Sequence, residues 1–376
     1  RHIDEEGVLI DAARVVEQGR LLEREVRALL GAGPWPARNI DDNLADLTAQ
    51  IAANMTGARE LGRMVEQFGL AVVQAYMGHV QDNAEASVRR VIDALDDGDY
   101  TYALDDGAQI RVAVRVDRTR RSAELDFTGT SAQHPFNYNA PLAVCRAVVL
   151  YVFRTLVGED IPLNEGCLKP LSIHAPAGSM INPAYPAAVI AGNTEVSQAI
   201  ADTLYGALGV LAGSQGTMNN LTYGNDRLQN YETLCGGTGA GHGFDGASAV
   251  HSHMTNTRMT DPEVLEARFP VRLETFALRH GSGGEGAWRG GDGVRRRLRF
   301  LSPMTAALIS SHRRLPPAGM AGGGAGAVGD NRIERACGDI EPLGGNAEAD
   351  LQPGDCLVID TPGGGGFGRP DSGEGG

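Results

Sequence analysis

The 376-residue sequence lacks the signatures of several protein classes. Its five cysteines are scattered and form no CxxC pair, so neither a disulfide framework nor a thiolate zinc site is indicated. No apolar run approaches the roughly 18 residues of a membrane-spanning helix. Asp4, Glu5 and Glu6 stand where a signal peptide would carry its apolar core. These absences favour a protein of the reducing cytoplasm.

Positive charge is also scarce. The 33 Lys and Arg residues face 47 Asp and Glu residues, and the net charge of −14 argues against binding to duplex DNA or to an anionic membrane surface. One basic run, residues 295–299, departs from this pattern. Two interpretations stay open: a patch that holds a phosphate or an acidic partner, or a strand whose charges point into solvent.

Glycine is the residue type in excess, with 51 copies, about twice the usual share of about 7%. The glycines show no fixed period, so they predict tight turns and close approaches of the backbone. The stretch 236–241 contains a GxG pattern but no following GK[ST], and it does not open a clear βαβ unit. The sequence therefore does not predict that this chain binds a nucleotide by itself.

Apolar residues recur at spacings of three and four between residues 44 and 95, which predicts helices over most of the first hundred residues. Asn39 or Asp41 is expected to cap the first of these helices, and Gly69 to break the pattern. We expect the apolar stripes of these helices to face the core.

The period then changes to two. Apolar residues alternate with polar or small ones over 110–116 and again over 123–127, with a short polar turn between them at 117–121. This pattern predicts an antiparallel hairpin with one buried face.

Two further helices are expected. The first runs from Pro141 to about residue 157 and closes at Gly158, in keeping with proline near a helix start and glycine just past its end. The second runs over 194–212, with Asn193 as its cap and Gly213 as its stop.

The rest of the chain reads as strands and glycine-rich loops, including a buried strand at 356–360. We therefore predict an α+β protein with N-terminal helices, a central mixed region and a glycine-rich, β-dominated second half. The expected units are a helical segment at 1–100, a mixed α/β to β-rich core at 101–368 and a disordered tail at 369–376.

Nine short motifs, in one order from about residue 5 to residue 368, make this sequence resemble the hydantoinase B/oxoprolinase family. They are RNIDDNLADL (38–47), QIAAN (50–54), QAYMGHVQDNAE (74–85), DFTGT (126–130), NYNAP (137–141), DIPLNEGC (160–167), SQGTMNN (214–220), HSHMTNTR (251–258) and RGGDG (289–293).

The resemblance implies a division of labour. A hydantoinase A half, an actin-like ATPase, binds ATP and Mg²⁺ and phosphorylates a lactam or ketone oxygen, and the B half processes the activated species. Within this resemblance, the residues around Tyr76, His251 and Thr361 imply 5-oxo-L-proline as the substrate, with L-glutamate as the product. The alternatives are an N-methylhydantoinase or acetone carboxylase alpha-type subunit, or a non-catalytic scaffold for the ATPase half.

The resemblance also implies partners that this chain does not contain. Family members carry an upstream segment rich in His, Asp and Gly, associated with a divalent metal, and it is not part of this sequence. We therefore assign no metal ligand to this chain and expect it to be inactive alone. Expected partners are a hydantoinase A-type ATPase, that missing N-terminal part, a small-molecule lactam and further copies of the chain, but neither nucleic acid nor a membrane.

Five polar residues are candidates for catalysis. If their segment is extended, His251 and His253 lie on one face of a strand, where they could act on substrate, share a metal or simply hydrogen-bond. The side-chain amides of Asn219 and Asn220 could bind a lactam or phosphoryl oxygen, or they could serve a turn. Glu232 is a further polar candidate near the glycine-rich stretch.

Four other positions are candidates for substrate binding. Asn193 could present a helix N-terminus to an anion or merely cap the helix. Arg258 could hold a carboxylate or order its loop by an ion pair. Gly237 and Gly239 could let backbone approach a ligand or a neighbouring subunit, or they could allow tight packing. Cys235 lacks an obvious base, so a buried inert thiol is favoured there.

Overall fold

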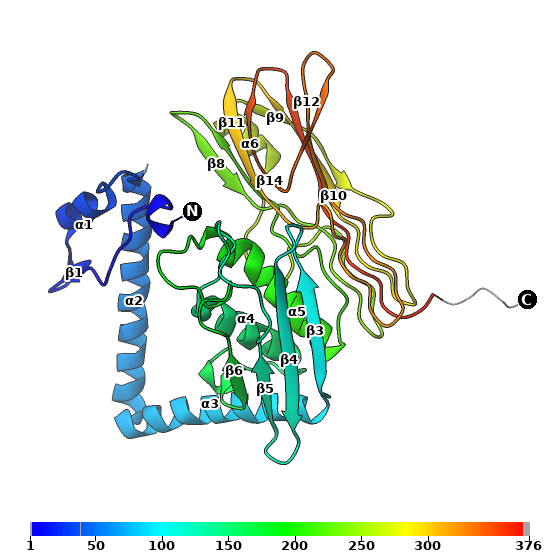
Figure 1. The fold of residues 1–376 in the computed structure, drawn as a ribbon. Helices are drawn as coiled ribbons and strands as arrows, with labels where there is room; N and C mark the ends of the chain where they lie inside the picture. The colour runs from blue at the N-terminus through cyan, green and yellow to red at the C-terminus, as the bar shows by residue number, and fades with distance from the viewer. Residues whose placement is uncertain (1, 38, 371–376) are drawn as a thin grey trace, which may run out of the picture.

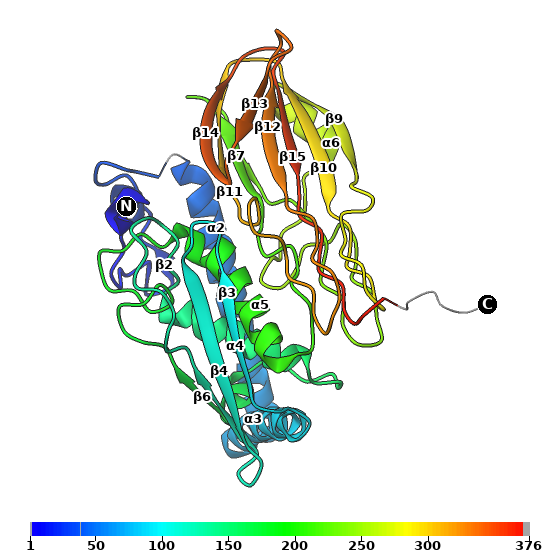
Figure 2. The same ribbon diagram turned by 45° about the vertical axis from the view of Figure 1, so that its right-hand side comes forward.

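The computed structural model describes residues 2–37 and 39–370 and has three parts (Figure 1). A helical arm leads into a lobe of helices and one sheet, which we call the α/β lobe. A second lobe, built from strands and glycine-rich segments, lies beside it and is called the β lobe (Figures 1 and 2). The predicted α+β class is confirmed. None of the helices in the described residues combines the length and apolar character needed to cross a membrane.

The arm begins after a small N-terminal unit and turns sharply once. Asn39 caps the long helix, because its side chain accepts a hydrogen bond from the backbone N–H of Asp42 at 3.4 Å. Gly69, with φ of +83°, separates the two long helices, so both predictions are confirmed. The elements are a 3-10 turn (Ile3–Glu5), β1 (Val16–Glu17), β2 (Arg20–Leu21), α1 (Glu23–Leu30), α2 (Ile40–Phe68) and α3 (Leu70–Asp93).

The apolar stripes of the arm do not all face a core. Val88 and Ile92 of α3 are fully buried in the α/β lobe, as predicted. Between residues 55 and 80 the prediction is wrong for most of the stripe, since Met55 is 60% exposed and Phe68 is 52% exposed, although Val73 is buried. Periodicity reports which face of a helix is apolar, but not whether anything covers that face. Here α2 stands beside the α/β lobe, and the helices that contact it are α1 and α3 (Figure 1).

The α/β lobe is a sheet covered by two helices. Its sheet has the order β3-β4-β5-β6, and the predicted hairpin is β4 and β5, with Asp117 paired to Ser122 across the turn. Strand β6 pairs parallel to β5. The elements are β3 (Gly98–Ala103), β4 (Gln109–Asp117), β5 (Ser122–Asp126), α4 (Leu142–Thr155), a 3-10 turn (Glu165–Leu168), β6 (Leu171–His174) and α5 (Ser197–Leu208).

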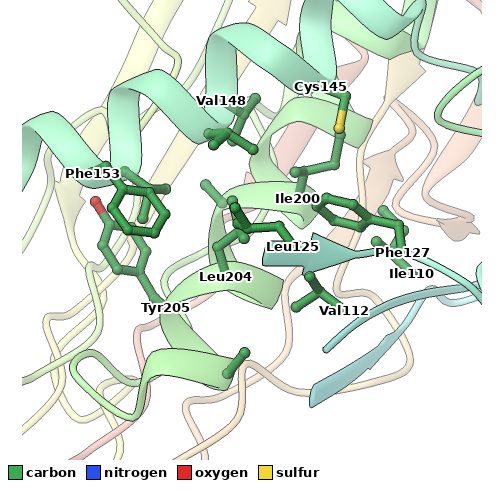
Figure 3. Close-up of a cluster of buried hydrophobic side chains, with 14 of the residues drawn as sticks. Ile110, Val112, Leu125, Phe127, Cys145, Val148, Phe153, Ile200, Leu204 and Tyr205 are labelled. Atoms are coloured by element: carbon green, nitrogen blue, oxygen red, sulfur yellow. The ribbon is translucent and has the colours of Figure 1, made fainter. Parts of the chain in front are cut away.

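The core of this lobe lies between the sheet and helices α4 and α5 (Figure 3). Side chains from β4 and β5, such as Val112 and Leu125, meet Val148 of α4 and Ile200 of α5, and all four are fully buried. Because α3 and β3 join this one core, residues on both sides of position 100 pack together. The division predicted there stays a prediction.

The two central helices differ in how well the sequence predicted them. Helix α4 begins after Pro141 and ends near the predicted position. Helix α5 ends at Leu208 rather than at residue 212, because Gly209 adopts a left-handed φ of +66° and caps it. The chain enters α5 through a π-helical turn, Gly192–Val196, and Asn193 lies inside this turn. The prediction of Asn193 as the helix cap is therefore wrong.

Two sheets enclose the core of the β lobe. Their strand orders are β14-β11-β7-β8 and β13-β12-β15-β10-β9, and β15 is the buried strand predicted at 356–360. The elements are β7 (Asn220–Gly224), β8 (Gln229–Glu232), α6 (Pro262–Arg268), β9 (Val271–Leu278), β10 (Val294–Phe300), β11 (Met304–Ile309), β12 (Asp330–Glu334), β13 (Ile340–Leu343), β14 (Asn346–Leu351) and β15 (Cys356–Asp360).

The basic run forms β10, but its charges are not simply solvated. Arg295 binds Asp360 through two hydrogen bonds, at 2.6 and 2.8 Å. Arg297 and Arg299 both pair with Glu274 on the neighbouring strand β9. The predicted strand is confirmed and its outward arginines stay partly exposed, but neighbouring strands supply a carboxylate for each of them.

The glycine-rich segments run side by side below the strands of the β lobe (Figure 1). Backbone hydrogen bonds join them: Gly364 donates to Gly291, and Gly291 donates to Thr238. A Cβ atom on Gly237 would lie 1.9 Å from the carbonyl oxygen of Gly291, and one on Gly239 would lie 1.8 Å from that of Ala212. These contacts favour tight packing as the reason for both glycines. The tail predicted to be disordered lies, after Pro370, outside the described residues.

Candidate functional site

Two adjoining cavities lie where the α/β lobe meets the β lobe. Their volumes are about 330 and 580 Å³, and they share Asp106, Tyr138 and Asn346 in their walls. The smaller cavity is also lined by Ser311 and Arg313. The walls therefore come from loops and strand ends of both lobes, and we call this pair the inter-lobe cavity.

A carboxyl group lies buried behind this cavity. Glu195 is 1% exposed and sits in the π-helical turn before α5, an irregularity that often marks functional sites. Its Oε1 accepts hydrogen bonds from Thr217 Oγ1, the Met218 N–H and Asn220 Nδ2, at 2.8 to 3.0 Å. Its Oε2 makes no hydrogen bond of ordinary geometry with the described residues. Burial raises the pKa of Glu195 to about 7, so this group can release or accept a proton near neutral pH.

Two hydroxyl groups connect this carboxyl to the cavity. The Ser311 hydroxyl lies beside both Glu195 and Tyr138, and its hydrogen bonding opposes the burial that raises the pKa of each. The phenol of Tyr138 donates to Asn346 Oδ1 at 3.0 Å in the cavity wall. The series Glu195, Ser311 and Tyr138 thus runs from the interior to the cavity.

The predicted asparagine pair lies next to this carboxyl, but its side-chain amides already form hydrogen bonds with other protein groups. Asn220 donates to Glu195 and to the Ile309 carbonyl, and accepts a hydrogen bond from Tyr231 at 2.7 Å. Asn219, with φ of +46°, accepts from the Arg313 guanidinium at 2.8 Å. The left-handed φ is the turn geometry that asparagine tolerates.

Arg313 supplies the positive charge of this cluster. Its guanidinium donates to the Ser311 carbonyl at 2.6 Å and to the side chain of Asn331 at 3.1 Å. Burial lowers the pKa of Arg313 to about 10, and the charge of Glu195 opposes this shift. The group therefore stays charged at neutral pH. No salt bridge joins it to Glu195 within the described residues.

The two histidines lie elsewhere, in a loop that crosses α5. The side chain of His253 is 5% exposed, and its Nε2 lies 3.0 Å from Oδ1 of the buried Asp202. His253 has φ of +49°, so the segment is not extended and the condition for a shared strand face is not met. His251 is half-buried, and burial lowers its pKa. Neither histidine lines the inter-lobe cavity.

The other candidates are dispersed. Glu232 forms an ion pair with Arg296 at 3.0 Å, with both side chains at most 3% exposed, inside the β lobe. Arg258 is exposed and forms no ion pair with any residue that the structure describes. Asn193 is exposed at the surface of the π-helical turn. Cys235 is buried, which raises the pKa of its thiol, as expected for an inert group.

The sequence did not single out Glu195, Ser311, Tyr138 or Arg313 as site residues. Two signals were present: Tyr138 lies within the NYNAP motif, and Glu195 is an acidic residue at the head of a largely apolar helix. Within residues 2–37 and 39–370, no group of three or more His, Cys, Asp or Glu side chains is arranged to hold a metal ion.

Fold and site together define a two-lobed α+β protein with a cavity and a buried carboxyl group at the junction of its lobes. The family model for hydantoinase B/oxoprolinase matches residues 1–370. The chain belongs to the hydantoinase B/oxoprolinase family.

Individual relatives agree with this assignment. The chain is 41% identical to 5-oxoprolinase of Dictyostelium discoideum, over 99% of the chain and 30% of that protein. It is 43% identical to 5-oxoprolinase 1 of Arabidopsis thaliana, over 97% of the chain and 31% of that protein. The crystal structure of ATP-dependent caprolactamase from Pseudomonas jessenii superposes with a TM-score of 0.84 at 25% identity, covering 98% of the chain and 68% of that structure. The chain thus spans about a third of the length of these 5-oxoprolinases.

Proposed function

We propose that this chain takes part in the ATP-dependent ring opening of 5-oxo-L-proline to L-glutamate, as a portion of the hydantoinase B half. The observation that carries the proposal is the identity of 41% and 43% to two 5-oxoprolinases along almost the whole chain. The similarity to an ATP-dependent caprolactamase supports the chemical class, because caprolactam is also a cyclic amide.

The chemistry explains why ATP is needed. The amide of a five-membered lactam is stabilised by resonance, so water attacks it slowly. A hydantoinase A-type partner that binds ATP and Mg²⁺ would transfer a phosphoryl group to the lactam oxygen. Water then adds to the ring carbon, and a second water releases phosphate from the acyl phosphate that forms when the C–N bond breaks with its electron pair on nitrogen. That nitrogen must take up a proton as it leaves.

The inter-lobe cavity supplies groups for this last step. Tyr138 and Asn346 line it, and Glu195 lies behind them with a pKa of about 7. A group that titrates near the working pH is suited to proton transfer. In the proposal, Tyr138 faces the substrate and Glu195 restores its proton through Ser311. The predicted roles of Asn219, Asn220, His251, His253, Glu232, Asn193, Arg258, Gly237 and Gly239 stay predictions.

One observation favours a second function, a non-catalytic scaffold for the ATPase half. The polar groups of Asn219 and Asn220 already bind protein atoms, and His253 and Glu232 are paired with Asp202 and Arg296. Side chains satisfied in this way fit a structural role as well as a catalytic one.

Reconstitution distinguishes the two functions. The chain is combined with a hydantoinase A-type partner and the upstream part of the B half, and ATP-coupled glutamate release is measured. Release from 5-oxoproline but not from hydantoin supports the proposed substrate. Tyr138→Phe should lower the rate at least ~10-fold, the order of a lost proton-transfer group, with assembly unchanged. Tyr185→Phe, at a tyrosine that is 71% exposed, is the matched control. An undiminished rate in Tyr138→Phe and in the combined variant His251→Ala, His253→Ala and Asn220→Ala would favour the scaffold.

A further inference from the structure

The loop that follows β11 carries two consecutive arginines into the wall of the inter-lobe cavity. Both line its smaller part, whose volume is about 330 Å³. Arg313 offers little to a ligand, because each nitrogen of its guanidinium already donates to a protein oxygen. Arg314 is exposed, and its guanidinium makes a single hydrogen bond, from Nη1 to the carbonyl oxygen of Asp105 at 3.1 Å. The charge of Arg314 is thus available to a molecule in the cavity.

The unused edge of Arg314 has the geometry that a carboxylate binds. Its Nε and Nη2 point in one direction, and neither has a partner among the residues that the structure describes. Such an edge forms two parallel hydrogen bonds to the two oxygens of a carboxylate. Within residues 2–37 and 39–370, no salt bridge joins Arg314 to an acidic side chain. The chain therefore leaves this cation without a counterion.

The two acidic residues in the wall of the smaller cavity do not compete for Arg314. The carboxylate of Asp105 accepts from the backbone N–H groups of residues 313–315, at 2.7 to 3.1 Å. These bonds also fix the backbone from which Arg314 projects. Asp106 lies 2.6 Å from Nε2 of His134. With two carboxylates and two guanidinium groups in this wall, an entering anion meets no excess of negative charge.

We infer that Arg314 binds the carboxylate of a carboxylate-bearing lactam in the inter-lobe cavity. The inference rests on the proposed function and names the residue that selects its substrate. In 5-oxo-L-proline the carbon that carries the carboxylate is bonded directly to the ring nitrogen. A carboxylate held at Arg314 therefore also fixes the position of that nitrogen, in the same small cavity as the phenol of Tyr138. Hydantoin has a ring of similar size but no carboxylate, so it gains no affinity from Arg314.

Binding of two small rings to the purified chain tests this role. The probes are 5-oxo-L-proline and γ-butyrolactam, the same five-membered lactam without the carboxylate, and ligand-observed NMR measures the Kd of each. The wild-type chain should bind 5-oxo-L-proline at least ~10-fold more tightly, the effect of a charge-assisted pair of hydrogen bonds. Arg314→Met should abolish this preference. Arg314→Lys keeps the charge but not the paired N–H groups, so it should retain part of the preference.

Two other arginines make the test specific. Arg120→Met removes a side chain that is 84% exposed in the turn between β4 and β5, and it should leave both Kd values unchanged. Arg258→Met removes the other arginine considered for carboxylate binding. The inference is overturned if Arg258→Met abolishes the preference and Arg314→Met does not, or if the wild-type chain has no preference for the ring with the carboxylate. Circular dichroism confirms that each variant is folded.

The reconstituted enzyme separates this inference from the proposed function. Arg314→Met should raise the KM for 5-oxoproline at least ~10-fold and leave inhibition by γ-butyrolactam unchanged, because only the first ring carries the group that Arg314 binds. An unchanged KM would overturn the role of Arg314. A wild-type enzyme that releases no glutamate would contradict the proposed function alone, since the binding preference of the chain does not depend on turnover.

Discussion

The side-chain amide of Asn220, the first residue of β7, donates a 2.8 Å hydrogen bond to the carboxylate of Glu195, in the turn that leads into α5. This bond joins the β lobe to the α/β lobe directly behind the inter-lobe cavity. A buried carboxyl whose pKa lies near 7 is thereby held at the junction of the two lobes. Its protonation therefore bears on both the stability and the chemistry of the junction.

Glu195→Gln should change how stability depends on pH. In the folded chain the Glu195 pKa is raised from 4.5 to about 7, so the native state holds this proton more tightly than the unfolded state. The stability that the proton provides is complete below pH 4.5 and is lost as the pH rises to about 7. The loss is on the order of 3 kcal/mol for a shift of this size. Glutamine cannot ionise, so the variant should lack this loss.

Urea denaturation between pH 5 and pH 8 measures the effect as the difference between wild type and variant. Glu124→Gln removes an exposed carboxylate of β5 and is the control, with a difference that should stay constant. A constant difference for Glu195→Gln as well would contradict the raised pKa.

Arg296→Met should destabilise the β lobe strongly. The ion pair with Glu232 is almost fully buried, so removing the arginine leaves an unpaired carboxylate in the interior. The expected loss is about 3–5 kcal/mol in the free energy of unfolding. Adding Glu232→Met should restore much of it, since the pair is then replaced by apolar groups. A double variant as unstable as the single one would show that the pair has no such coupling.

His253→Ala should destabilise the chain by removing one hydrogen-bond partner of the buried Asp202, whose Oδ1 also accepts from the Ser214 N–H at 3.1 Å. The expected cost is about 0.5–1.5 kcal/mol, that of one lost hydrogen bond. His253→Gln places an amide N–H near the original Nε2 and should recover part of the stability. In the reconstituted enzyme, a His253→Gln variant with normal stability but lost turnover would instead assign His253 to the reaction.

Gly364→Ala should disrupt the packed glycine segments. Its Cβ would lie 1.8 Å from the carbonyl oxygen of Thr238, so the backbone itself must move. The expected loss is on the order of 3 kcal/mol. Gly78→Ala is the opposite case, because a Cβ there meets nothing within 4 Å in the middle of α3. It should stabilise the chain by roughly 0.5–1 kcal/mol. Thermal unfolding compares the two, and equal effects would contradict the packing argument.

The parts of the fold that depend on near neighbours in the chain were predictable. The Asn39 cap, the break at Gly69 and the hairpin of β4 and β5 each follow from residues within a few positions of one another. Distant contacts were not predictable: the basic residues of β10 are paired because β9, β12 and β15 bring carboxylates to them.

The candidate site was predictable only in part. Asn219 has the turn geometry that was predicted, whereas Asn220 begins β7, and both lie beside the cluster behind the cavity. Glu195 was passed over, because its raised pKa arises from burial against segments around Thr217 and Ser311 that are remote in sequence. Desolvation is a property of the packed interior and leaves no pattern in neighbouring residues.

The sequence by itself determined the order of helices and strands, the family and the apolar face of each helix. These features depend on periodicity, capping residues and motifs, and each of these involves residues that are close together in the sequence. Only the tertiary structure decided which apolar faces are covered and which charges are paired or buried. In the folded chain Val88 and Glu195 are buried, whereas Phe68 is exposed to solvent. The physical reason is that solvation depends on every atom that packs around a group, and most of those atoms belong to distant parts of the chain.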